Sequence, residues 1–191
     1  MTRNLKPFLV VPMLSLAPMM AAAAETGADD FVSKRSEYVS LQPARSVELP
    51  ALRSGEGFAP LLADVTQTFY IGNWTGALVY AGGGLTGSSV PYPLPSALNF
   101  STPYYYSGAG QALVPALTPW SQVFAYTTNP ADPYGQAKTC VWQADVSVVN
   151  GVCTANVTTF AYGAQGVLCH LDTASSVDPN SCQLFVGVGI E

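Results

Sequence analysis

Apolar and polar residues alternate in short runs along much of the chain. In the segment 65–71, valine, glutamine, phenylalanine and isoleucine occupy alternate positions, with threonine and tyrosine between them. The segment 183–190 has the same period, with leucine, valine and isoleucine on one face and glutamine, phenylalanine and two glycines on the other. Successive side chains of a strand point to opposite faces of its sheet, so this period predicts β-strands with one buried face.

Further runs rich in β-branched and aromatic residues predict more short strands. They cover the segments 77–81, 98–106, 111–117, 122–127, 139–149, 152–162 and 167–171. Residues 107–110 are expected to form a turn and residues 129–135 a loop, because both are rich in turn-forming residues. Pro91, Pro93 and Pro95 each lack an N–H donor, so their segment is expected to be a loop or a sheet edge.

The number and spacing of these strands indicate the fold class. No segment has a convincing amphipathic helical pattern, whereas at least eight short strands are separated by turn signals. This arrangement is typical of an all-β protein. We therefore expect an antiparallel β-sandwich or a barrel-like domain.

The first 24 residues have the pattern of a secretory signal peptide. Arg3 and Lys6 precede an apolar run at 8–20, and three alanines at 22–24 supply a cleavage site. The apolar run is shorter than the roughly 20 residues that a transmembrane helix needs. We therefore expect a secreted or periplasmic protein with a cleaved signal peptide and no transmembrane span.

Two regions of different composition follow the expected signal peptide. Residues 25–57 hold many charged residues and few large apolar ones, which predicts a poorly ordered polar lead-in. Within it, the segment 39–52 has a modest alternation and can pair as an edge strand. Residues 58–191 are expected to form a single β domain.

Cysteine is confined to the last third of the chain, at Cys140, Cys153, Cys169 and Cys182. An even number of cysteines in an exported protein is typical of disulfides. Zinc-binding spacing is absent, and the lone His170 cannot complete a pair of histidine ligands. We expect two disulfides, no metal site and no cofactor.

Two signals in this region conflict over which cysteines pair. Cys140 and Cys153 have the same spacing as Cys169 and Cys182, and sliding one segment by 29 residues aligns the two pairs in a weak internal repeat. This favours local disulfides within each pair, with the other two pairings left open. Asn-Gly at 150–151 instead predicts a tight hairpin. That hairpin would hold Cys140 and Cys153 about eight residues, or roughly 26 Å, apart.

The charge of the chain excludes some classes of function. The chain of 191 residues has a net charge of −5, and only 10% of its residues are charged. After Arg53 the only basic residue is Lys138, so no basic cluster is available for phosphates. Nucleic-acid binding is therefore excluded, and binding to an anionic membrane surface is disfavoured. The segment 65–131 has no ionisable side chain except tyrosine.

Aromatic residues in the middle of the chain are the candidate binding residues. Flat rings stack on the C–H faces of sugars, and a tyrosine or tryptophan combines an apolar ring with a polar tip. The alternative is that these rings fill the core of the β domain. The candidates for glycan or surface binding are Tyr104, Tyr105, Tyr106, Trp120, Tyr126 and Tyr134.

His170 is the one histidine and the weak catalytic candidate. In a strand, Asp172 would lie on the same face and could orient the imidazole, as in a hydrolase. The G-x-S-x-G motif of many serine hydrolases is absent. We therefore expect a non-catalytic structural or binding role in the cell envelope or outside the cell, with a glycan or an envelope protein as partner. A small secreted hydrolase using His170 with a carboxylate is the alternative, and the oligomeric state is left open.

Overall fold

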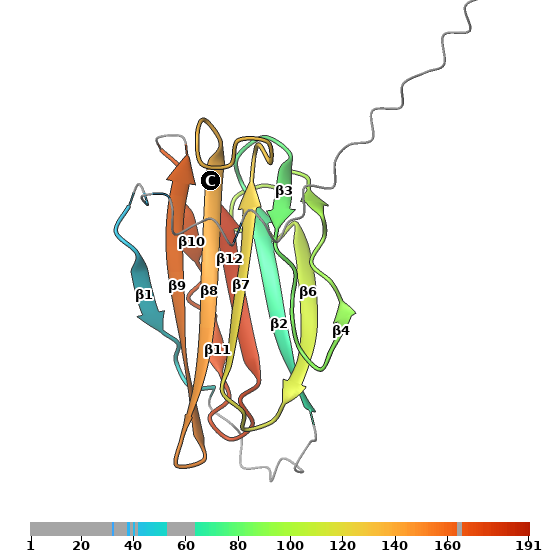
Figure 1. Cartoon of the computed structure of the whole chain (residues 1–191), viewed down its shortest axis with the longest axis vertical. Coiled ribbons are helices and arrows are strands. Elements are labelled where there is room, and N and C mark those ends of the chain that lie inside the picture. The colour runs from blue at the N-terminus through green and yellow to red at the C-terminus, as the bar shows by residue number, and fades with distance from the viewer. Residues whose placement is uncertain (1–31, 33–37, 39, 41, 53–63, 164–165) are drawn as a thin grey trace, which may run out of the picture.

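A computed structural model describes residues 32, 38, 40, 42–52, 64–163 and 166–191 of the chain (Figure 1). Its described residues form twelve β-strands arranged in two sheets. The all-β prediction is therefore confirmed. The expected signal peptide at 1–24 lies outside the described residues.

The first sheet has six strands and is built on the long β8–β9 hairpin. All of its strand pairs are antiparallel. In spatial order its strands are β1 (Arg45–Glu48), β9 (Val152–Gly163), β8 (Lys138–Val149), β7 (Trp120–Thr127), β3 (Val79–Gly82) and β5 (Ala97–Leu98).

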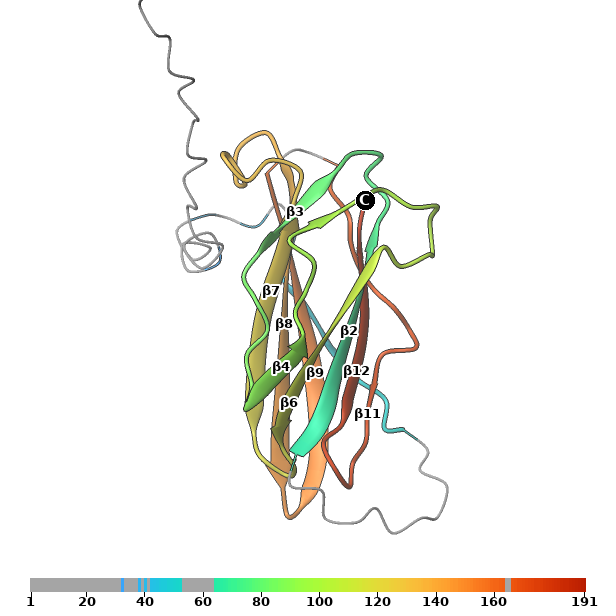
Figure 2. The same cartoon turned by 90° about the vertical axis from the view of Figure 1, so that its right-hand side faces the viewer.

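The second sheet packs against the first, as the side view in Figure 2 shows. In spatial order its strands are β10 (Cys169–Leu171), β12 (Leu184–Ile190), β2 (Asp64–Asn73), β6 (Gly108–Pro115) and β4 (Ser89–Tyr92), and β11 (Ser176–Val177) pairs with β12. Its β12–β2 pair is parallel and the others are antiparallel. Neither sheet closes on itself, so the structure is a sandwich.

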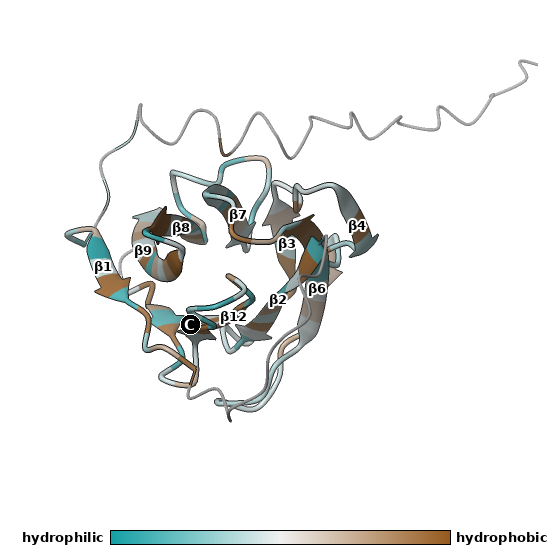
Figure 3. Ribbon diagram, turned by 90° about the horizontal axis from the view of Figure 1, so that it is seen from below, coloured by the Kyte–Doolittle hydropathy of each residue, from teal (hydrophilic) through white to brown (hydrophobic). Residues whose placement is uncertain are grey.

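The core lies between the two sheets and follows from the alternation in the sequence. In β2, Val65, Gln67, Phe69 and Ile71 are buried, whereas the residues between them are partly exposed. Figure 3, which views the sandwich along its strands, shows the two sheets as opposite walls of this interior. The proline-rich segment contributes β4 at the edge of the second sheet, as expected from its missing donors.

The expected strand at 98–106 is largely wrong. β5 ends at Leu98, and the chain turns at residues 103–104. Tyr104 has a φ of 72°, in the left-handed region that a strand does not use. The predicted turn at 107–110 is also wrong, because β6 begins at Gly108. The aromatic residues of this segment therefore predicted a strand where the structure has a surface loop.

The Asn-Gly hairpin is confirmed. Asn150 and Gly151 have φ values of 53° and 75°, as a turn with two left-handed residues requires. The hairpin register pairs Cys140 with Ala161 and Val148 with Cys153.

The local disulfides favoured by the spacing are wrong. The structure pairs Cys140 with Cys169 and Cys153 with Cys182. The hairpin places Cys140 and Cys153 far apart along β8 and β9, beyond the reach of one disulfide. Each disulfide instead joins the first sheet to the chain of the second sheet.

Residues 45–52, the β1 strap, close one side of the sandwich. The Leu49 amide donates to the Ala155 carbonyl of β9, and the Leu52 amide donates to the Val177 carbonyl of β11. The strap thus passes from the first sheet to the second. β1 is the edge strand anticipated in the segment 39–52, and it lies inside the expected lead-in.

Candidate functional site

Two adjacent glycines, Gly72 and Gly189, lie on the outer face of the second sheet, and we call them the glycine floor. Gly72 of β2 lies beside Gly189 of β12 in the parallel register. A β-carbon added at Gly72 would lie 2.7 Å from the Trp74 ring, and one at Gly189 would lie 2.5 Å from it. Because both positions lack side chains, the Trp74 indole packs directly on the sheet.

A row of rings extends to both sides of Trp74. The Trp74 ring centroid lies 5.2 Å from that of His170 and 5.9 Å from that of Tyr104. We call Tyr104, Trp74 and His170 the ring row. Tyr104 is 89% exposed and Tyr105 is 69% exposed, so rings are presented to solvent at the loop end of the row.

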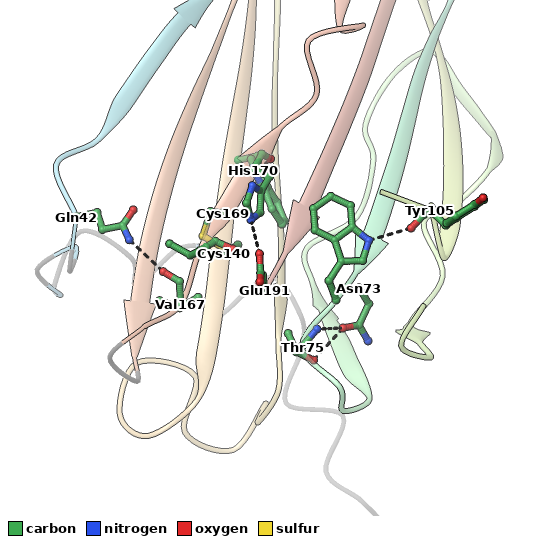
Figure 4. A network of polar contacts seen from close by, with 12 residues as sticks. Gln42, Asn73, Thr75, Tyr105, Cys140, Val167, Cys169, His170 and Glu191 are labelled. Carbon is green, nitrogen blue, oxygen red and sulfur yellow. Dashed lines mark hydrogen bonds and ion pairs between the residues drawn. A yellow bond between two sulfur atoms is a disulfide. The ribbon is translucent and has the colours of Figure 1, made fainter. Parts of the chain in front are cut away.

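Hydrogen bonds fix Trp74 in this position. Its indole N–H donates to the Tyr105 carbonyl at 3.0 Å (Figure 4). The buried Asn73 side chain donates to the carbonyls of Ala77 and Leu98 and accepts from the Thr75 amide. The turn that carries the indole is therefore tied to its surroundings on both sides, and the ring is held before any ligand arrives.

A second group of rings lies next to the ring row on the same sheet. Tyr70 contacts Tyr106 and Phe185, with ring centroids 5.2 and 5.3 Å apart. The Tyr106 hydroxyl lies over Gly187 and donates to the Asp172 carboxylate. Burial, followed by this hydrogen bond and the negative charge of Asp172, raises the pKa of Tyr106 well above its usual value.

His170 pairs with a different carboxylate from the one expected. Its Nε2 lies 3.0 Å from Oε2 of Glu191, and both side chains are partly exposed (Figure 4). Asp172 instead accepts hydrogen bonds from Tyr106 and from the Ala174 amide. His170 and Asp172 are therefore neighbours in the sequence, but in the structure each side chain binds a different partner.

Ser175, which follows Asp172 by three residues, is not positioned as a nucleophile. Ser175 is buried, and its hydroxyl is hydrogen-bonded to the backbone of Gly187, accepting from the amide and donating to the carbonyl. A hydroxyl engaged in this way holds the loop to β12. Among the described residues, the arrangement is therefore a histidine–carboxylate pair without an adjacent activated serine.

The structure separates the six candidate aromatic residues. Tyr104 and Tyr105 contact Trp74, whereas Tyr106 contacts Tyr70 and Asp172. Trp120 points into the sandwich and contacts Phe69. Tyr126 is fully buried and donates its hydroxyl to the Pro95 carbonyl.

Tyr134 belongs to the opposite face of the molecule. Its ring stacks on Tyr38 at 4.0 Å and meets Tyr162 edge-on at 5.1 Å. Tyr162 belongs to a small apolar cluster in the first sheet. Tyr134 therefore covers that sheet and takes no part in the ring row.

Sequence reasoning missed Trp74 and the glycines beneath it. The signal was present in β12, where Gly187 and Gly189 occupy the face opposite Val186, Val188 and Ile190. Glycine in a strand interior often marks the close approach of another group. The covering residues come from a loop and a distant turn, so the sequence did not indicate which ring would lie there.

Neither a metal centre nor a helical membrane span is found in the described part of the chain. No group of three or more histidine, cysteine, aspartate or glutamate residues there could hold a metal ion. No helix formed by those residues is long and apolar enough to cross a membrane. The two disulfides are of the kind typical of proteins in oxidising compartments.

Comparisons with known proteins found no matching family model, no similar curated protein and no similar solved structure.

Proposed function

We propose that the protein is a non-catalytic, glycan-binding β domain that acts outside the cell or in the cell envelope. The observation that carries this proposal is the ring row, with Trp74 packed on Gly72 and Gly189 and with Tyr104 almost fully exposed. A sugar can stack on these flat faces without first displacing the side chains that present them.

The chemistry around the ring row also suits a glycan. Glu191 and His170 supply a carboxylate and an imidazole beside the Trp74 ring, and both can hydrogen-bond sugar hydroxyls. Combining apolar faces with a few placed polar groups is the usual composition of a small-molecule site. Rings held in place before binding also lower the entropy cost of association.

The proposed location rests on the two disulfides and on the signal-peptide pattern at 1–24. Disulfides persist in secreted and periplasmic proteins and are rare in the cytosol. A glycan ligand would then be a polysaccharide of the cell's own envelope or of a surface to which the protein attaches.

The experiment is a glycan-array screen of the domain from residue 25 onwards, followed by titration calorimetry with the best ligand. Tyr104→Ala should weaken binding by about tenfold or more, since it removes the most exposed stacking face. Tyr80→Ala is the matched control, because Tyr80 is an exposed tyrosine on the other sheet. An array without any binding, or equal losses in both variants, would contradict the proposal.

A secreted hydrolase is the second candidate, favoured by the contact of 3.0 Å between His170 Nε2 and Glu191 Oε2. Replacing an essential general base lowers the turnover of an enzyme by orders of magnitude. His170→Ala should therefore abolish hydrolysis of any substrate found, whereas a binding domain should keep measurable affinity. Activity that survives in His170→Ala would reject this candidate.

A further inference from the structure

A pocket of about 410 Å³ opens at the seam between the two sheets. It lies between the β1 strap and β10, the two sheet edges on this side of the sandwich. Its volume falls within the range of small-molecule sites, roughly 300–1,000 Å³. His170 of β10 lines this pocket and also belongs to the ring row on the outer face of the second sheet.

The strap places a cation in this seam. Arg45 pairs in register with Thr159 and shares one face of the strand with Val47 and Leu49. Leu49 is buried in the core, Val47 is partly buried and Arg45 is exposed, so this face runs from the interior out to solvent at Arg45. All four residues line the pocket.

Arg45 is the permanently cationic side chain of the pocket lining. The other ionisable residues of the lining are His170, which is paired with Glu191, and Asp172, which accepts from Tyr106 and Ala174. Arg45 has no hydrogen bond or ion pair to any described residue. A planar guanidinium binds a carboxylate through two parallel hydrogen bonds.

The rest of the lining is partly apolar. Val47, Leu49 and Leu171 provide aliphatic surface, and Cys169 contributes its side of the disulfide to Cys140. Thr159 provides a hydroxyl next to Arg45 in the strand register. This lining matches a ligand with one negative group and a compact apolar body.

We infer that the seam pocket binds a small organic monocarboxylate, with its carboxylate on Arg45 and its apolar body against Val47, Leu49 and Leu171. Arg45, Val47, Leu49 and Leu171 do not belong to the ring row, although His170 of the ring row also lines the pocket.

The test uses butyrate, hexanoate, benzoate and phenylacetate as probes, each beside the corresponding alcohol. Binding is followed by amide chemical shifts of the labelled domain up to about 10 mM ligand, which detects millimolar affinity. At least one carboxylate should shift the amides of Thr159, Leu171 and Ser175 in a saturable way, and its alcohol should bind at least about tenfold more weakly.

Three variants complete the experiment. Arg45→Gln should weaken the best carboxylate by about tenfold or more, Arg45→Lys should retain part of the affinity, and Lys138→Gln should leave it unchanged. Tyr104→Ala should also leave it unchanged, whatever its effect on glycan binding. The inference is overturned if no carboxylate shifts these amides, if the alcohols bind equally well, or if Arg45→Gln binds like the wild type.

Discussion

At Gly189 the absence of one β-carbon decides the shape of the outer face of the second sheet. Together with Gly72 it lets the Trp74 ring lie on the backbone, where His170 and Tyr104 extend it into the ring row. A larger residue at either glycine would lift the indole away from the sheet. The sequence offered no direct evidence of this, because Trp74 is brought there by a turn.

Gly189→Ala should therefore displace Trp74, since the new β-carbon would lie 2.5 Å from its ring. We expect a changed near-ultraviolet circular dichroism spectrum and a loss of glycan affinity of about tenfold or more. Gly84→Ala is the control, because Gly84 is exposed and nothing lies within 4 Å of its added β-carbon. A Gly189→Ala protein with the wild-type spectrum and affinity would show that the indole is not held by the glycine floor.

Tyr126 provides a prediction for alkaline pH. Burial raises the pKa of its hydroxyl well above the usual value of about 10. Above about pH 10 the Tyr126 hydroxyl loses its proton in the unfolded chain but keeps it in the folded protein. The free energy of unfolding therefore falls as the pH rises through this range. Below about pH 10 this contribution is fully present. Urea unfolding at a series of pH values should show a shallower alkaline loss for Tyr126→Phe than for the wild type, and parallel profiles would refute this assignment.

At the scale of elements, the strands were predictable wherever their residues alternate. The expected strands at 139–149 and 152–162 correspond closely to β8 and β9, and the turn between them follows from two residues. The loop that carries Tyr104 was not predictable, because aromatic residues in general favour strands. Tyr104 instead has a left-handed backbone conformation, which is incompatible with a strand.

The disulfides show how a correct observation led to a wrong pairing. The offset of 29 residues that aligned the cysteines is the sequence separation within each observed disulfide. Cysteines treated as equivalent members of a repeat are in fact bonded partners. The hairpin register carried the decisive information, since it fixes the distance between Cys140 and Cys153.

Each disulfide should contribute to stability by restricting the unfolded chain. In the chain-entropy model a loop of this separation is worth about 3.6 kcal/mol. Replacing both cysteines of one pair by alanine should lower the free energy of unfolding by roughly that amount, as urea unfolding would measure. Peptide mapping without reduction provides the independent check, and a peptide linking Cys140 to Cys153 would contradict the connectivity.

The β1 strap should depend on its buried leucine. Leu49→Ala is expected to cost about 2–5 kcal/mol of unfolding free energy, because Leu49 is 5% exposed in the core. Leu52→Ala, at a position that is 42% exposed, should change stability by less than about 0.5 kcal/mol. Equal effects of the two substitutions in urea unfolding would mean that the strap does not close the sandwich through Leu49.

At the scale of the whole molecule, the two sheets divide the aromatic residues among three environments. Tyr126 and Trp142 fill the interior, Tyr134 covers the first sheet, and Tyr104 belongs to the exposed ring row on the second. Composition predicted an aromatic binding surface and a β core, but it could not assign each ring to one of them. That assignment depends on long-range strand pairing, above all on β12 lying beside β2.

The position of β12 has a consequence for biosynthesis. A chain is synthesised from its N-terminus, yet β12 fits between β10 and β2, two strands that are made before it. β2, β6 and β4 can pair before then, but the second sheet cannot be completed until residues 184–190 have been made, and until then one edge of β2 lacks its partner strand. Such an open edge is prone to wrong association. We expect the nascent chain to need protection, by a chaperone or by rapid completion of synthesis, until β12 is available to pair.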